Sequence, residues 1–158
     1  MTSYTGVVRA VRPLPGELFP LVNPHAQVNN PAQRLTFEVM TAELTGHTAI
    51  GTDDYTYTIG HAHRTMVACA AFLVDPVGLS RDTTNYNEYS VRIDGTEGFN
   101  QDSRYSLIAN VPFEITRLAT VANRTTAEGD AITIKITGSS SGRAINHGTR
   151  VYVVFYWV

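Results

Sequence analysis

The residues best suited to hold a metal ion are two histidines near the middle of the chain, His61 and His63. Residues two apart on a β-strand point to the same face, so both imidazoles could reach one ion. His147 is the distant candidate for a third ligand. Because two ligands and a remote third make an incomplete set, the simpler interpretation is an exposed histidine pair next to Gly60. We predict no cofactor.

An enzyme of the cupin type, which is also a jelly roll, is the chemical alternative for this histidine pair. Cupins follow their His-x-His pair with a glutamate a few residues later and with another histidine downstream. Here Val67 and Ala68 stand where that glutamate would be. The glutamate ligand of the motif is therefore missing, and a cupin-like metal enzyme is only the third of three functional hypotheses.

Nucleophilic and acidic groups are present, but they lack the partners that would activate them. Cys69 lies in an apolar run, which favours an unreactive buried thiol. The serines at 139–141 stand between two glycines, without the Gly-x-Ser-x-Gly pattern of a nucleophile elbow. The aspartates at 53–54 and Asp82 fit turns better than a calcium loop, which would need more spaced carboxylates. We predict that the protein is not an enzyme.

The composition indicates one β-rich globular domain. Of 158 residues, 43% are hydrophobic and only 16% are charged, below the usual quarter or so. The net charge of −2 argues against a nucleic-acid binder, which would usually carry a basic face. No apolar stretch is long enough to span a membrane. The first residues lack a signal-peptide pattern, so we expect synthesis in a cytoplasm.

Alternation of apolar and polar residues predicts short strands along most of the chain, and it is cleanest at 131–136. The continuous apolar run 65–74 is predicted as a buried strand, although a short helix would also fit. Turn residues separate these runs, and none shows helical periodicity. The pattern predicts an all-β fold, a jelly-roll-like β-sandwich or barrel. The other predicted strands are 4–12, 34–40, 54–59, 86–93, 105–108, 113–121 and 150–158.

Five of the seven prolines lie between Pro13 and Pro31. This density excludes helix and central strand and favours an extended course. The segment also carries apolar side chains, so it is either a long loop packed on its own domain or an arm that reaches a partner. We therefore divide the chain into a first strand and arm, 1–34, and a β-sandwich, 35–158. The residues predicted to bind the partner are Leu14, Leu18, Phe19, Leu21 and Val22.

The last predicted strand has no polar face. Residues 151–158 are all β-branched or aromatic, whereas a strand with one wet face would alternate apolar and polar residues. Both faces therefore need cover, from a second layer of the chain or from another subunit. The residues predicted for an oligomer interface are Tyr152, Val154, Tyr156 and Trp157.

The stretch 79–91, with its Asp82-Thr-Thr-Asn-Tyr86 segment before an alternating strand, resembles small β-rich proteins of tailed-phage virions. Together with the arm and the terminal strand, it is similar to the decoration (cement) proteins that sit on phage heads, commonly as trimers. The resemblance implies a virion protein that binds the major capsid protein and stabilises the assembled capsid. It carries over no catalytic or ligand residues.

A second functional hypothesis is a phage receptor-binding or carbohydrate-binding β-sandwich, because Tyr152, Tyr156 and Trp157 could form a stacking platform for sugars. Because these rings lie in an otherwise wholly apolar strand, a core or a subunit interface is the simpler location for them. The favoured expectation is a structural virion protein that acts as a homo-oligomer, a trimer by the resemblance, with no contact to nucleic acid or membrane.

Overall fold

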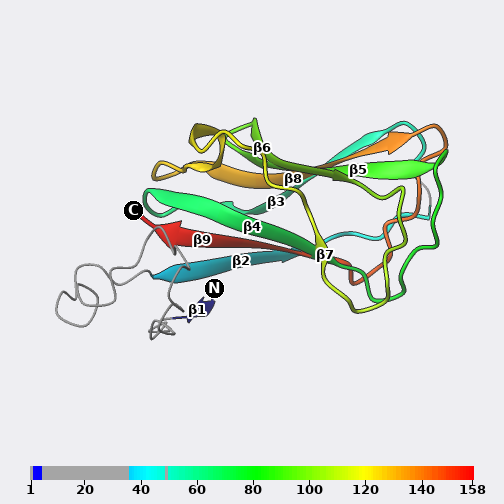
Figure 1. The fold of residues 1–158 in the computed structure, drawn as a ribbon, viewed down its shortest axis with the longest axis horizontal. Coiled ribbons are helices and arrows are strands. Elements are labelled where there is room, and N and C mark those ends of the chain that lie inside the picture. The colour runs from blue at the N-terminus through cyan, green and yellow to red at the C-terminus, as the bar shows by residue number, and fades with distance from the viewer. Residues whose placement is uncertain (1, 5–35, 49) are drawn as a thin grey trace, which may run out of the picture.

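The computed structural model describes residues 2–4, 36–48 and 50–158, while residues 1, 5–35 and 49 lie outside the described part. The described chain consists of strands and one short 3-10 helix, which confirms the all-β prediction (Figure 1). The elements are β1 (Thr2–Tyr4), β2 (Phe37–Glu43), β3 (Asp54–His61), β4 (Met66–Val74), β5 (Tyr86–Ile93), β6 (Thr96–Asp102), β7 (Phe113–Glu114), η2 (Ala122–Arg124), β8 (Ala131–Ser139) and β9 (Arg150–Trp157).

The strands form two antiparallel sheets, ordered β1-β2-β9-β4-β7 and β3-β8-β5-β6, which lie one above the other in Figure 1. Apart from the hairpin β5–β6, successive strands from β2 to β9 alternate between the two sheets. This order is that of a jelly roll, in which two four-stranded sheets form a sandwich, and β1 adds a short edge strand. The predicted jelly-roll sandwich is therefore confirmed. The predicted strand 4–12 and the proline-rich arm fall almost wholly outside the described residues.

The core lies between the sheets and is formed by the inward side chains of both. Ile132, Ile134 and Ile136 of β8 face it from one sheet and are fully buried. Val153 and Phe155 of β9 face it from the other and are also fully buried. The period of two along each strand places alternate residues on the opposite face, so every central strand also has an outer face.

Strand β6 was not predicted, because its sequence is mostly polar. It begins at a tight turn. Asp94 and Gly95 both have positive φ, 45° and 77°. Positive φ at both central residues defines the tight turn that suits a two-residue hairpin. Ile93 and Thr96 therefore pair directly, and β6 follows β5 as its hairpin partner. The strand that starts at this turn was missed.

Two predicted strands are largely wrong. Tyr105–Ile108 contains only an isolated bridge, between Leu107 and Leu79. The run 113–121 forms a strand only at Phe113–Glu114 and then leaves one sheet for the other. Its Ile115 amide donates to the carbonyl of Ala71 in β4, and the next contacts are made with β6. Apolar residues that bridge two sheets give the same sequence signal as a strand.

In the described part of the chain, no helix has the length and apolarity to cross a membrane.

Candidate functional site: two unlike outer faces of the sandwich

The terminal strand β9 is central in its sheet, paired along its length with β2 on one side and β4 on the other. Val151, Val153 and Phe155 point inward and are fully buried. Tyr152 and Val154 alternate with these residues, so they point outward and are half-buried. The second sheet therefore covers one face of β9. Among the described residues, no further layer covers its outer face.

This outer face carries a shallow apolar groove that crosses strands far apart in sequence. Its side chains come from β2, β9 and β4 and from the residue before β7. Every one of them is aliphatic, aromatic or proline, and together they give the outer face its apolar character. The lining residues are Val39, Phe72, Val74, Pro112, Tyr152 and Val154.

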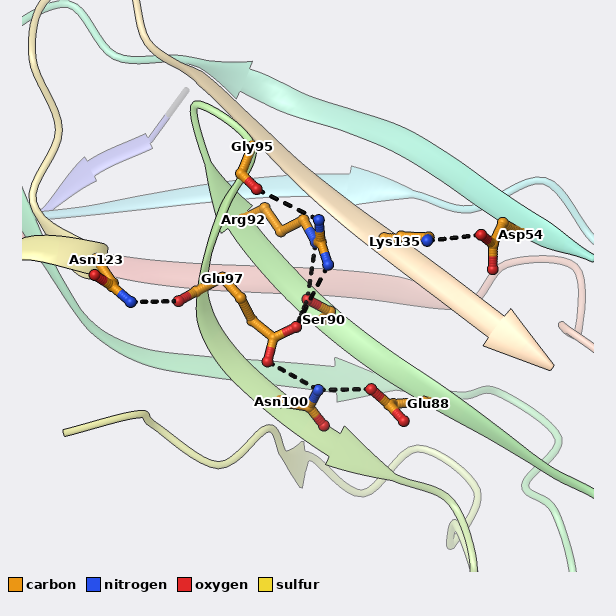
Figure 2. A network of polar contacts seen from close by, with 9 residues as sticks. All are labelled: Asp54, Glu88, Ser90, Arg92, Gly95, Glu97, Asn100, Asn123 and Lys135. Atoms are coloured by element: carbon orange, nitrogen blue, oxygen red, sulfur yellow. Dashed lines mark hydrogen bonds and ion pairs between the residues drawn. The ribbon is translucent and has the colours of Figure 1, made fainter. Parts of the chain in front are cut away.

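The outer face of the other sheet is polar and held by a network of hydrogen bonds (Figure 2). Arg92 Nε donates to Ser90 Oγ at 3.2 Å, and Ser90 Oγ donates to Glu97 Oε2 at 2.7 Å. Asn100 Nδ2 donates to Glu88 Oε1 at 2.7 Å and to Glu97 Oε1 at 3.0 Å. Ser90 is buried beneath this network, whereas Glu88 is exposed and the other side chains are half-buried.

An ion pair continues the polar face onto β3 and β8, where Lys135 Nζ lies 2.6 Å from Asp54 Oδ2 (Figure 2). The hydrogen bond from Lys135, followed by one from Thr137, lowers the pKa of Asp54. The two outer faces of the sandwich thus differ in kind. One is a polar network, and the other is a shallow apolar groove.

Of the four residues predicted for the oligomer interface, Tyr152, Val154 and Tyr156 share the outer face of β9, and Trp157 does not. Trp157 packs against the rim of the core, and its Nε1 donates to Glu38 Oε2 at 3.3 Å. The Arg64 guanidinium lies 3.9 Å from the centre of its ring. The three aromatic rings considered as a sugar platform therefore do not lie on one face.

The two histidines of the metal hypothesis lie at the end of β3 and just beyond it. His61 pairs with Ala131. His63 Nε2 lies 3.4 Å from Glu38 Oε2 and meets Trp157 edge-on. His147, the candidate third ligand, lies against Gly46 in a separate loop. The part of the chain that the structure describes contains no group of three or more His, Cys, Asp or Glu residues placed to hold a metal ion.

Cys69 sits at a β-bulge in β4, where the register with β9 shifts between Ala68 and Ala70. Its Sγ donates to the carbonyl of Val154 at 3.3 Å. Burial raises the pKa of the Cys69 thiol. Because the thiolate is the reactive form, a raised pKa makes this thiol less nucleophilic at neutral pH.

The residues predicted to bind a partner through the arm, Leu14 to Val22, lie outside the described residues. Their flanks are described. Tyr4 in β1 pairs with Phe37 in β2. The Trp157 amide donates to the carbonyl of Thr36 at 3.0 Å. The segment 5–35 therefore leaves and returns at the same edge of the sheet that carries the groove.

A second group of exposed apolar side chains was not predicted from the sequence. It stands on the β4–β5 and β6–β7 connections, which the Leu79–Leu107 bridge joins. Val77 and Ile108 are 69% and 65% exposed. Single apolar residues in polar loops give no periodic signal, so only the contact between the two loops reveals that they lie together.

No family model and no curated protein matches this chain. Among solved structures, a chain of infectious bursal disease virus, Gx strain, is similar with a TM-score of 0.43 and 13% identity, covering 78% of this chain and 32% of that one. A chain of the Gt strain has a TM-score of 0.38 and 14% identity, covering 81% and 35%. This chain thus spans about a third of the length of either viral chain.

Proposed function

We propose that this protein is a structural component of a virion that binds an assembled phage capsid as a homotrimer and stabilises it. The observation that supports this most is the apolar outer face of the sheet β1-β2-β9-β4-β7. Viral capsid domains are among the proteins that use jelly rolls. Apolar grooves on folded domains serve as contact sites for other proteins, and the polar network opposite suits a solvated surface.

In the proposed assembly, the copies contact one another through the outer face of β9, at Tyr152, Val154 and Tyr156, with Trp157 at the rim. The apolar residues of the arm, 14–22, contribute to binding within the particle, and the major capsid protein is the partner of the trimer. Three linked copies bind a lattice more tightly than one, because each later contact is intramolecular. The role is mechanical and needs no catalytic group.

The first experiment measures the oligomeric state of the full chain by multi-angle light scattering. We expect a mass of about three times the chain mass of 17.3 kDa. The double variant Tyr152→Ser, Val154→Ser is expected to elute as a folded monomer, since it removes two apolar contacts from the outer face. Thr133→Ser, on the polar outer face, is the matched control and should remain trimeric. A monomeric wild-type chain at micromolar concentration would contradict the proposal.

The second experiment tests the capsid itself by co-sedimentation with empty heads of the phage that encodes the chain. We expect saturable binding, and heads that withstand a higher temperature when the protein is bound. A chain that trimerises but never sediments with heads would leave an oligomer without the proposed partner, and would refute capsid binding.

A further inference from the structure

The groove on the outer face has the chemistry of a site for an extended, proline-rich peptide. The rings of Phe72 and Tyr152 and the side chain of Pro112 line it together with three valines. Aromatic-lined grooves bind proline-rich segments because such segments are already extended and lose little entropy on docking. The shallow, wholly apolar lining offers no charged group to select a polar ligand.

The chain itself contains a segment of this composition. Residues 13–24 include four prolines, and the apolar side chains between them are the five predicted to bind a partner. The ends of the surrounding stretch are placed at the β1–β2 edge, where Tyr4 pairs with Phe37. Val39, two residues further along β2, is itself part of the groove. The proline-rich segment is therefore tethered beside a groove that suits it.

The length of the tether sets how far the segment can reach. An extended proline-rich chain rises about 3.1 Å per residue, so Leu14 stands roughly 30 Å of chain away from Tyr4. Strands are about 4.8 Å apart, so the whole sheet from β1 to β7 is only roughly 19 Å wide. On the returning side, Val22 stands roughly 40 Å of chain from Thr36. Both stretches exceed the width of the sheet, so the segment is long enough to reach beyond its own groove to the groove of an adjacent copy.

We propose that the proline-rich segment 13–24 of one copy docks in the outer-face groove of a neighbouring copy, against Phe72, Tyr152 and Val154. This inference rests on the proposed homo-oligomer and names the contact that holds it together. The arm and the terminal strand are then two halves of one interface. Exchange of an arm between copies covers the apolar groove without requiring two flat sheets to meet face to face.

The test places a photo-crosslinker in the groove of the full chain, as Tyr152→p-benzoylphenylalanine. Equal amounts of ¹⁵N-labelled and unlabelled protein are mixed, irradiated and digested, and the crosslinked peptides are sequenced by mass spectrometry. We expect crosslinks from position 152 to residues 13–24 that join one heavy and one light peptide. The same crosslinker at Thr56, which is exposed on the other sheet, should give none of these.

A pair of variants in the segment tests whether its apolar side chains bind the groove or whether the tether alone holds the segment near position 152. Leu18→Asp combined with Phe19→Asp should lower the crosslink yield by at least about tenfold, because one large apolar side chain is worth that much in affinity. Gln27→Asp adds a charge at a polar position of the same stretch and should leave the yield unchanged. Equal yields for both variants would overturn the inference.

The other possible outcomes separate a failure of the arm exchange from a failure of the proposed oligomer. Crosslinks that join only peptides of the same isotope would place the segment in its own groove and refute exchange. A trimer whose position 152 crosslinks only to strands of another copy would refute the inference and leave the proposed oligomer intact. A monomer by light scattering without mixed-isotope crosslinks would refute both.

Discussion

Trp157 donates its indole N–H to Oε2 of Glu38 across 3.3 Å, and His63 approaches the same oxygen at 3.4 Å. Glu38 is only 1% exposed, and its other oxygen, Oε1, is buried without a hydrogen-bond partner among the described residues. A buried acid whose bonding capacity is half used contributes little to stability, because its loss of hydration offsets what its partners supply. The carboxylate is therefore better understood as orienting Trp157 than as stabilising the fold.

Replacement of this acid by an apolar side chain of similar size should not harm the protein. We expect Glu38→Met to leave the free energy of unfolding unchanged or to raise it by about 1–2 kcal/mol. Trp157→Phe should cost about 1 kcal/mol or more in the wild-type background, since it removes a donor from a buried oxygen. In the Glu38→Met background, the part of this cost that comes from the lost donor should vanish. Urea titrations of the four proteins measure the coupling, and strictly additive costs would contradict the orienting role.

Arg124 stabilises the bulge in β4. It is 6% exposed, and its Nη1 donates to the carbonyl of Ala68 at 2.8 Å. Desolvation lowers the pKa of its guanidinium. We expect Arg124→Met to lower the free energy of unfolding by about 1.5–3 kcal/mol, because a buried carbonyl loses a charged donor while the aliphatic contacts are kept. Urea unfolding measures the effect, and exposed Arg81→Met is the control, expected to change it by less than about 0.5 kcal/mol.

Tyr89 should make the fold sensitive to alkali. Burial raises its pKa to about 12, from an ordinary value of 10.0. The folded protein therefore holds the phenolic proton more tightly than the unfolded chain does. The resulting stabilisation is fully present below pH 10 and is lost as the pH rises from 10 towards 12, by up to about 2.7 kcal/mol. Tyr89→Phe should flatten the curve of unfolding free energy against pH in this window, and an unchanged slope would contradict the assignment.

Asp75 organises the base of the exposed loops. Its carboxylate accepts the amides of Val77 at 2.9 Å and Gly78 at 2.6 Å, and also the side chains of Asn146 and Thr149. We expect Asp75→Ala to cost about 3–5 kcal/mol, because it leaves several donors near a buried site without an acceptor.

The cost of losing Asp75 is measured by urea unfolding, and hydrogen exchange at the Gly78 amide reports the loop directly. Exchange at this amide should accelerate in the Asp75→Ala variant. Asp102→Ala is the matched control, because Asp102 forms a partly exposed ion pair with Arg104 and should cost about 1 kcal/mol or less. Equal costs for the two variants would show that Asp75 is not the organising residue.

The strands that were predicted well are those whose inward side chains alternate strictly. Ile132, Ile134 and Ile136 alternate with polar residues and form the buried face of β8. The ambiguous run 65–74 proved to be β4, and its nearly continuous apolarity reflects a core on one side and the groove on the other. The missed strand has a physical explanation. β6 is an edge strand held by its hairpin, so its own residues carry little pattern.

The sequence by itself determined that this protein is an all-β sandwich and that its terminal strand needs cover on both faces. These properties depend on residue type and on a period of two, which are local. Only the tertiary structure decided which face of β9 the second sheet covers, and that Trp157 turns away from Tyr152 towards Glu38. It also brought Val39, Phe72 and Pro112 into one groove. Their contact arises from the order of strands in the sheet, and strand order is set by long-range pairing that no local pattern records.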